Sequence, residues 1–506
     1  MLIFAIVCFL VPAAALEKRN AVIMIADDAG MESPFYSNNV CQTPNLNSLA
    51  SKSLIFDRAF TSVSSCSPSR SVIMTGLPQH QNGMYGLHQK EIHFNTFDSV
   101  KSVPLLLNSS GVRTGIIGKK HVGPESVYPY EFEYTEENGY SILQVGRNIT
   151  FIKDLVHEFL QTQDDRPFFL YIGFHDPHRC GHTQPQYGNF CEKFGNGEPD
   201  MGFIPDWKPV LYSPDDVIVP YFVPDTPAAR ADIAAQYTTI SRLDQGIGLV
   251  VKELENAGYL DSTLVIYSSD NGIPFPSGRT NLYDPGMIEP MLVSSPLATH
   301  RNGDHSQAMV SLVDIVPTVL DWFDVAYPNY SIFKSDLPVQ LTGRSLLPVL
   351  EEEPESGFDE IYASHSLHEI TMYYPMRVYR NRRYKLIKNL NYKMPFPIDE
   401  DFFLSPTFQD ILQRSHQKEL THWYKTLHDY YYRDQWELFD LEQDPHELHN
   451  VADEPSRQDI LEDMKTRLHK WQNATNDPWI CAQEGVLENV GRFPRSGVCL
   501  PLYNEL

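Results

Sequence analysis

The sequence has 506 residues, of which 42% are hydrophobic and 12% aromatic, so the chain can bury a large core and is long enough for more than one domain. Its formal net charge of −25 at pH 7 argues against a broad groove for nucleic acid or another polyanion, because such a groove needs a basic face. An anionic ligand must therefore be held in a local pocket.

The N-terminus has the pattern of a secretory signal. Residues 2–10 are apolar and Ala13-Ala14-Ala15 offers small residues for cleavage, which predicts a signal peptide over residues 1–15, although its positive start is weak. No later run approaches the roughly 20 apolar residues that span a bilayer, so we expect a soluble protein of the secretory pathway. Four N-x-S/T sequons fit that route, at Asn108, Asn148, Asn329 and Asn473.

Short apolar runs then alternate with helical patterns, which predicts a largely parallel sheet covered by helices. The predicted strands are residues 21–26, 114–118, 168–174, 263–269 and 290–295. Thr43-Pro44 opens one helix, and Thr226-Pro227 opens a long one that runs to about Ala257 with an apolar stripe. Beyond an acidic linker at residues 351–355, we expect a strand at 384–387 and an amphipathic helix at 455–472.

Between the first two strands lies a short predicted helix, Pro68–Thr75, with Ser67 as its N-cap and Gly76 as its end. Cys66 then sits at a helix N-terminus, where unpaired N–H groups and the positive end of the helix dipole favour an anion such as a sulfate or phosphate ester. Taken alone, Cys66 fits a buried or disulfide-bonded cysteine before an ordinary helix better than it fits an anion site.

Polar clusters directly follow four of the predicted strands. In open parallel sheets the ligand crevice lies beyond the carboxyl ends of the strands, so these clusters are expected to converge with Cys66. Their members are Asp27, Asp28, Lys119, His121, His178, Asp270 and Asn271. The acidic and amide members offer oxygen ligands, which suit Ca²⁺ or Mg²⁺, although ordinary turn chemistry would place the same residue types there.

The pentad Cys66–Arg70, C-S-P-S-R, matches the C-x-P-S-R signature of the type I sulfatases, and residues 111–121 resemble the second signature of that family. The resemblance implies an α/β fold of the alkaline-phosphatase and sulfatase type, with a mixed, largely parallel sheet flanked by helices over residues 20–360. A smaller C-terminal α+β domain would follow over residues 361–506. It also implies that a formylglycine-generating enzyme oxidises Cys66 to formylglycine during secretion.

The resemblance implies a role for each candidate residue. Formylglycine 66 would be the nucleophile, and His178, with a pKa near its ordinary value, would protonate the leaving group. The cations expected around the sulfate are Arg70, Lys119, His121 and Arg279, whereas Lys120 is expected to be solvated. One Ca²⁺ per subunit would be held by Asp27, Asp28, Asp270 and Asn271. His368 and Glu369 would line the sugar pocket, with ordinary surface positions as the alternative.

The seven cysteines divide once Cys8 is assigned to the signal and Cys66 to the active site. Of the five that remain, Cys180 and Cys191 are close enough to close one loop, and Cys481 and Cys499 another. Cys41 is then left as a free thiol.

Several segments resemble one branch of the family, whose members remove N-linked sulfate from terminal glucosamine residues of heparan sulfate in the lysosome. These segments are residues 79–88, 175–182, 269–283, 393–399 and 436–450. The resemblance also implies a homodimer. Three alternatives stay open: a phosphohydrolase of the same superfold, an O-sulfatase acting on another glycosaminoglycan ester, and a non-catalytic protein that binds sulfated glycans.

Overall fold

The computed structural model describes residues 19–89, 92–181, 186–333, 338–488 and 498–501. The predicted signal peptide and Cys8 lie outside the described residues. Among the helices of the described part, none has the length and apolar character needed to cross a bilayer.

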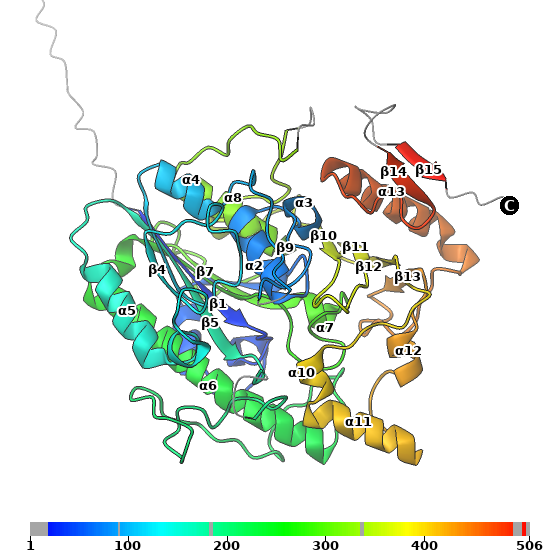
Figure 1. Ribbon diagram of the computed structural model, residues 1–506, viewed down its shortest axis with the longest axis horizontal. Helices are drawn as coiled ribbons and strands as arrows, with labels where there is room; N and C mark the ends of the chain where they lie inside the picture. The colour runs from blue at the N-terminus through cyan, green and yellow to red at the C-terminus, as the bar shows by residue number, and fades with distance from the viewer. Residues whose placement is uncertain (1–18, 90–91, 182–185, 334–337, 489–497, 502–506) are drawn as a thin grey trace, which may run out of the picture.

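A nine-stranded sheet forms the centre of the molecule, in the order β4-β3-β5-β1-β6-β7-β2-β8, with β9 also paired to β2 (Figure 1). Its strands are β1 (Asn20–Asp27), β2 (Leu54–Phe60), β3 (Arg113–Gly118), β4 (Phe132–Thr135), β5 (Phe168–Pro177), β6 (Thr263–Ser269), β7 (Ile288–Ser294), β8 (His305–Ser306) and β9 (Val310–Ser311). β7 runs antiparallel to both neighbours, and the other described pairs are parallel. The predicted mixed, largely parallel sheet is therefore confirmed.

Helices cover both faces of this sheet because its strands are apolar on both sides. In β1, Ile23 and Ile25 face one layer and Val22 and Met24 the other. The first layer holds α2 (Cys66–Thr75), α4 (Val103–Ser109), α8 (Ile315–Trp322) and α9 (Leu347–Glu351). The second holds α1 (Pro44–Ala50), α5 (Ile149–Gln161) and α6 (Pro227–Asn256), on the opposite side of the sheet in Figure 1.

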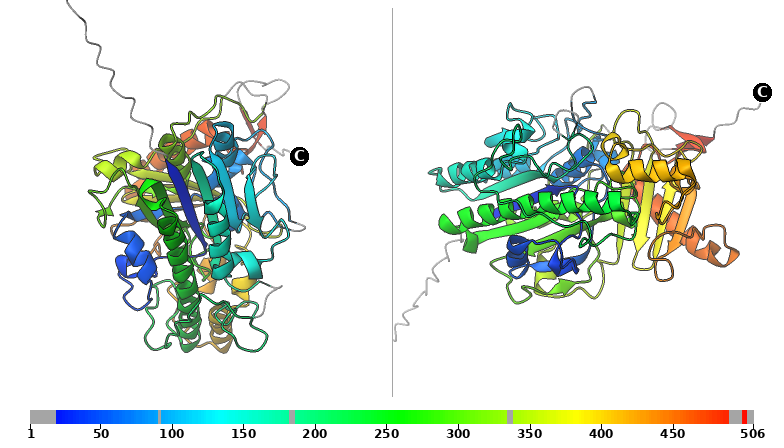
Figure 2. Two further views of the ribbon diagram at one scale, coloured as in Figure 1. Left: turned by 90° about the vertical axis from the view of Figure 1, so that its left-hand side faces the viewer. Right: turned by 90° about the horizontal axis from the view of Figure 1, so that it is seen from below.

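A second, antiparallel sheet lies at one end of the first and appears yellow to orange in Figure 2. It comprises β10 (Glu360–His365), β11 (Met376–Asn381), β12 (Tyr384–Asn389) and β13 (Trp436–Asp440). The helix α13 (Gln458–Ala474) covers one face through Leu461, Met464 and Leu468. The other face packs on Leu282 and Tyr283, which belong to a loop of the central unit. The smaller C-terminal part expected from the sequence is thus attached directly to the loops beside the central sheet.

The remaining elements are short. They are α3 (Gln79–Asn82), α7 (Asp284–Met287), α10 (Glu400–Phe403), α11 (Pro406–Gln417), α12 (Leu427–Tyr431), β14 (Gly485–Glu488) and β15 (Val498–Pro501). Both expected disulfides, Cys180–Cys191 and Cys481–Cys499, are present. Cys41 is free and buried.

Candidate active site

The helix that carries the nucleophile candidate starts earlier than the sequence predicts. α2 begins at Cys66 itself and its N-cap is Ser65, so the assignment of Ser67 as N-cap is wrong. Ser67 instead lies inside the helix, where its Oγ accepts a hydrogen bond from the backbone N–H of His88 at 2.8 Å. Gly76 ends the helix in the left-handed conformation, as expected. Cys66 therefore occupies the first helical position, with only 2% of its surface exposed.

A cavity of about 580 Å³ opens above Cys66, beyond the carboxyl ends of β1, β3, β5 and β6. Seven residues singled out in the sequence line it: Cys66, Lys119, His121, His178, Arg279, His368 and Glu369. Arg70 and the four proposed metal ligands are also fully buried around its floor. The parallel arrangement thus brings the strand-end clusters together.

The acidic residues form a compact group. Ligand atoms of Asp27, Asp28, Cys66 and His178 all lie within 4.8 Å of one another. The backbone N–H of Asp28 donates to Oδ1 of Asp270 at 3.2 Å, and Nδ2 of Asn271 donates to Oδ1 of Asp28 at 2.6 Å.

Two buried oxygens of this group, Oδ1 of Asp27 and Oδ1 of Asn271, have no hydrogen-bond partner among the described residues. Buried polar atoms are rarely left unpaired, and oxygen donors suit a hard divalent cation. The residues present therefore fit a metal site.

Each buried carboxylate is paired with its own cation. Nζ of Lys119 lies 2.5 Å from Oδ2 of Asp27, and Nη1 of Arg279 lies 2.5 Å from Oδ2 of Asp28. Nε of Arg70 donates to Oδ2 of Asp270 at 2.9 Å, and Nη2 of Arg70 lies 2.8 Å from the same oxygen. Burial alone would raise the pKa of Asp27, but the charge of Lys119 holds it well below its ordinary value. The three carboxylates and the three cations at the floor of the pocket therefore balance in charge.

Two glycines let the strands that carry these groups approach closely. Gly118 has a φ of +93°, and a Cβ there would lie 2.1 Å from the carbonyl oxygen of Gly173. A Cβ on Gly173 would lie 2.2 Å from the carbonyl oxygen of Lys119. Just beyond this contact β5 bulges, since Ile25 pairs with Gly173 whereas Asp27 pairs with Pro177. The bulge precedes His178, which lines the cavity.

His178 is neutral in this arrangement, contrary to the expected pKa near the ordinary value. Its Nε2 accepts from Nη1 of Arg279 at 2.8 Å, so its Nδ1 carries the proton that is donated to the carbonyl of Arg179 at 2.7 Å. Burial lowers the pKa of His178 well below 6.5, because the charged form loses its hydration. Its role as the acid remains a prediction.

Lys120 is not solvated as expected. It is buried, and its Nζ lies 2.8 Å from Oε1 of Glu133 on β4, the neighbouring strand. His121 points into the cavity with burial lowering its pKa, and its Nδ1 has no partner within the described chain.

The C-terminal part closes the cavity with residues that sequence reasoning missed. Nη2 of Arg279 lies 2.8 Å from Oδ2 of Asp399 and also contacts Asp401. Nε2 of His368 lies 3.0 Å from Oδ2 of Asp399, and its Nδ1 lies 2.8 Å from Oγ of Ser65. The only signal in the sequence was the acidic run 399–401 after residues 393–398. His368 and the half-buried Glu369 therefore line the pocket rather than the ordinary surface.

Asp176, two residues before His178, is not part of the cavity lining. Asp176 binds Nη1 of Arg147 at 2.6 Å and Nε of Arg242 at 2.7 Å. This buried network fastens the end of β5 to α6.

The sequons lie outside the site. Asn329 and Asn473 are exposed, whereas Asn108 and Asn148 are half-buried. Asn148 caps α5 by accepting from the N–H of Phe151 at 3.1 Å.

Comparison with known families matches residues 19–325 to the sulfatase model and residues 402–474 to the model described as N-sulphoglucosamine sulphohydrolase, C-terminal. Human N-sulphoglucosamine sulphohydrolase is 63% identical over 490 residues, which cover 97% of this chain and 96% of the human protein. The N-acetylglucosamine-6-O-sulfatase of Bacteroides thetaiotaomicron is 24% identical, with 91% and 88% of the two chains covered.

Two solved structures share the fold. One, a protein in complex with its substrate D-glucosamine-2-N,6-O-disulfate, has a TM-score of 0.64 at 20% identity and covers 91% of this chain and 98% of its own. The other, the phosphonate monoester hydrolase of Agrobacterium radiobacter, has a TM-score of 0.60 at 17% identity and covers 90% of this chain and 96% of its own. At these identities the likeness establishes the architecture alone.

Proposed function

The chain belongs to the sulfatase family, and we propose that it is a sulfohydrolase that removes N-linked sulfate from terminal glucosamine residues of heparan sulfate. The observation that supports this choice of substrate is the 63% identity, over 97% of the chain, to human N-sulphoglucosamine sulphohydrolase. The cavity agrees with a terminal residue as substrate. About 580 Å³ accommodates a small ligand, and the net charge of −25 argues against a broad basic face for a polymer.

The nucleophile in this proposal derives from Cys66. Formylglycine at this position supplies a hydrated aldehyde, one hydroxyl of which attacks sulfur while the other later allows the sulfate to leave. At the first helical position this group lies next to unpaired backbone N–H groups, which favour negative charge. Lys119, His121 and Arg279 line the same cavity, where their donors would face the sulfate oxygens.

The buried carboxylates would serve two purposes. Asp270 fixes the position of the guanidinium of Arg70. From that position Arg70 would contact the bound anion. Together with Asp27, Asp28 and Asn271, Asp270 would hold a calcium ion, which would draw electron density from the sulfate oxygens. His178 is neutral in the free site, so it would have to take up a proton as the anionic substrate binds before it could deliver the proton that the departing amine needs.

The first experiment compares substrates. Release of sulfate from N-sulfoglucosamine and from glucosamine 6-sulfate should be measured with the purified secreted protein at acidic pH. Preference for the N-sulfate supports the proposal. Preference for the 6-sulfate would identify an O-sulfatase, the activity named for the Bacteroides relative.

The second experiment examines the nucleophile. Mass spectrometry of the peptide that contains Cys66 should find the aldehyde in place of the thiol, and Cys66→Ser should fold but release no sulfate, because a serine cannot form a hydrate. Cys41→Ser is the matched control, since Cys41 is the other free cysteine of the described chain and is buried elsewhere. An unmodified Cys66 in an active preparation would contradict the formylglycine mechanism, whereas an unmodified Cys66 in an inactive preparation would favour a glycan-binding protein.

We also propose the cellular setting that accompanies this activity. Residues 1–15 would direct the chain into the secretory pathway, where the formylglycine-generating enzyme acts on Cys66, the four sequons are glycosylated and the mature homodimer travels to the lysosome. Residues 20–360 would form the catalytic domain and residues 361–506 the smaller domain that completes its pocket.

A further inference from the structure

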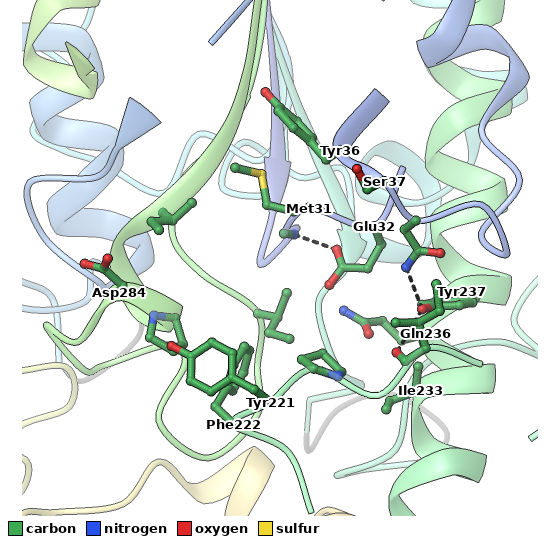
Figure 3. A pocket seen from close by; sticks show the side chains of 17 residues that line it. Met31, Glu32, Tyr36, Ser37, Tyr221, Phe222, Ile233, Gln236, Tyr237 and Asp284 are labelled. Carbon is green, nitrogen blue, oxygen red and sulfur yellow. Dashed lines mark hydrogen bonds between the residues drawn. The ribbon is translucent and has the colours of Figure 1, made fainter. Parts of the chain in front are cut away.

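A second cavity, of about 300 Å³, lies behind the catalytic pocket (Figure 3). Its walls come from the segment after β1, from α6, and from the loops around residues 218–222 and 273–288. Most of the lining is apolar, including Phe222, Ile233 and Ile273. Cavities of this size and character take small organic ligands.

Two polar groups distinguish this cavity from a packing defect. Gln236 is 1% exposed, yet its Nε2 has no hydrogen-bond partner among the described residues. Figure 3 shows Gln236 and Glu32 among the side chains that line the cavity. Oε2 of Glu32 accepts from the N–H of Gly30 at 2.9 Å. Burial raises the pKa of Glu32 to about 7, so its carboxyl is largely uncharged in acid.

The hydroxyls of two lining tyrosines already have hydrogen-bond partners. The hydroxyl of Tyr237 accepts from Nδ2 of Asn38 at 2.7 Å and donates to the carbonyl of Ile218 at 3.2 Å. The hydroxyl of Tyr36 donates to the carbonyl of Phe56 at 2.9 Å. Glu32 and Gln236 therefore form the polar pair that is free to select a ligand.

The outer wall of the cavity is held by the C-terminal part of the chain. Nε1 of Trp423 donates to the carbonyl of Phe222 at 2.8 Å. The ring of Tyr221 stacks on that of His446, with 4.0 Å between the centroids. This wall is thus preformed, which lowers the entropic cost of binding.

The cavity shares two loops with the catalytic pocket. Asp27 and Asp28 face the catalytic side, and the same loop continues into Gly30 and Glu32 on the walls of the second cavity. Likewise, Asp270 and Asn271 are followed by Ile273 on the second wall.

The two loops are in direct contact with each other. The N–H of Ala29 donates to Oγ of Ser269 at 2.9 Å, and a Cβ on Gly30 would lie 2.6 Å from Cγ2 of Ile273. A molecule in the second cavity would press on the back of both loops.

We propose that this cavity is a second ligand site, for a small neutral ring compound bearing a carboxamide, and that its occupation stabilises the two loops of the catalytic pocket. The amide N–H of the ligand donates to Glu32, and its carbonyl accepts from Nε2 of Gln236 after a small rotation of that side chain. The ring fills the apolar space next to Phe222 and Ile233. A carboxylate in place of the amide is disfavoured, because a charged group would lose its hydration in this largely apolar cavity.

Benzamide is a suitable probe, and benzoate is its anionic counterpart. Equilibrium dialysis with the full chain should give saturable binding of benzamide at least tenfold tighter than that of benzoate. Gln236→Met keeps the size of the side chain and should weaken benzamide binding about fivefold, the loss of one neutral hydrogen bond. Gln245→Met, on the same helix but outside the cavity, should leave binding unchanged. Ile218→Trp, at a position 43% exposed on the cavity wall, should block entry without disturbing the core.

Hydrogen exchange tests the link between the two pockets. Saturating benzamide should slow exchange in peptides that span residues 28–33 and 270–276 in the wild type, but not in Ile218→Trp. Absence of saturable binding, or equal binding by Gln236→Met and Gln245→Met, would overturn the site. Binding without slower exchange in these peptides would overturn the link. Neither measurement involves sulfate hydrolysis, so both outcomes are independent of the proposed reaction.

Discussion

Replacing Asp176 with asparagine should destabilise the protein, although the residue lies only two positions before His178, a candidate catalytic residue. Asp176 is 2% exposed, and its two partners Arg147 and Arg242 are fully buried. Both carboxylate oxygens are engaged, at 2.6 to 2.8 Å. Asparagine keeps the shape but leaves two buried guanidinium groups without a counter-charge.

The size of the effect follows from the burial. Removing one partner of a buried ion pair costs about 3–5 kcal/mol. Unfolding entropy is about 2.1 cal/mol/K per residue, which for a chain of 506 residues is about 1 kcal/mol/K. The melting temperature of Asp176→Asn should therefore fall by about 3–5 °C.

Differential scanning calorimetry at one scan rate would measure this shift. The matched control is Asp463→Asn, which breaks a 2.8 Å pair with Arg467 on the surface of α13 and should change the melting temperature by less than about 0.5 °C. Sulfate release by Asp176→Asn, corrected for the folded fraction, should stay near that of the wild type. Equal melting of the two variants, or lost activity at an unchanged melting temperature, would refute a structural role for Asp176.

Three further outcomes are expected. Asp270→Ala should lose both activity and the calcium binding that isothermal titration calorimetry measures. Asp261→Ala, at an exposed position, is the control and should keep both. Unchanged calcium binding by Asp270→Ala would show that Asp270 is not a calcium ligand. His178→Ala should slow the hydrolysis of N-sulfoglucosamine by a factor of about 10² to 10⁴. The same variant should largely keep its rate on an activated aryl sulfate, because the phenolate leaves without a proton. An equal loss of rate on both substrates would mean that His178 binds sulfate instead. Burial alone would raise the pKa of Asp477, but Arg377 at 2.6 Å holds it well below its ordinary value. The stabilisation by Asp477 is complete above the pKa of about 3.9 in the unfolded chain and is lost as pH falls. The difference in melting temperature between the wild type and Asp477→Asn should therefore become smaller from about pH 5 to about pH 3. A difference that stays constant with pH would contradict this explanation.

Local sequence was sufficient for much of the central unit. Apolar runs bounded by polar residues predicted the strand at 263–269 with its bounds, because a strand buried on both faces must be apolar throughout. Polar residues at the ends of parallel strands were expected to converge, and Lys119 and Asp27 do meet, because such ends share one edge of the sheet. The helix after Thr226 was predicted from that N-cap residue and from the helical spacing of the apolar residues that follow it.

Tertiary structure decided which of these polar groups face the cavity. Asp176 and His178 are two residues apart, yet the bulge in β5 directs the first to Arg242 and the second to Arg279. The start of α2 at Cys66 also depends on the packing of Ser65 against His368, some 300 residues further along the chain. No local pattern encodes such a contact.

Tertiary structure also decided which residues form the far wall of the catalytic pocket. Asp399 reaches Arg279 only because the second sheet packs on the loop that carries Leu282 and Tyr283. The sequence by itself determined the elements and the chemistry at the ends of the strands, since both depend on neighbours within a few residues. The partners of each charge were decided by the folded chain, because a buried ion must find its counter-charge in space, wherever that residue lies in the sequence.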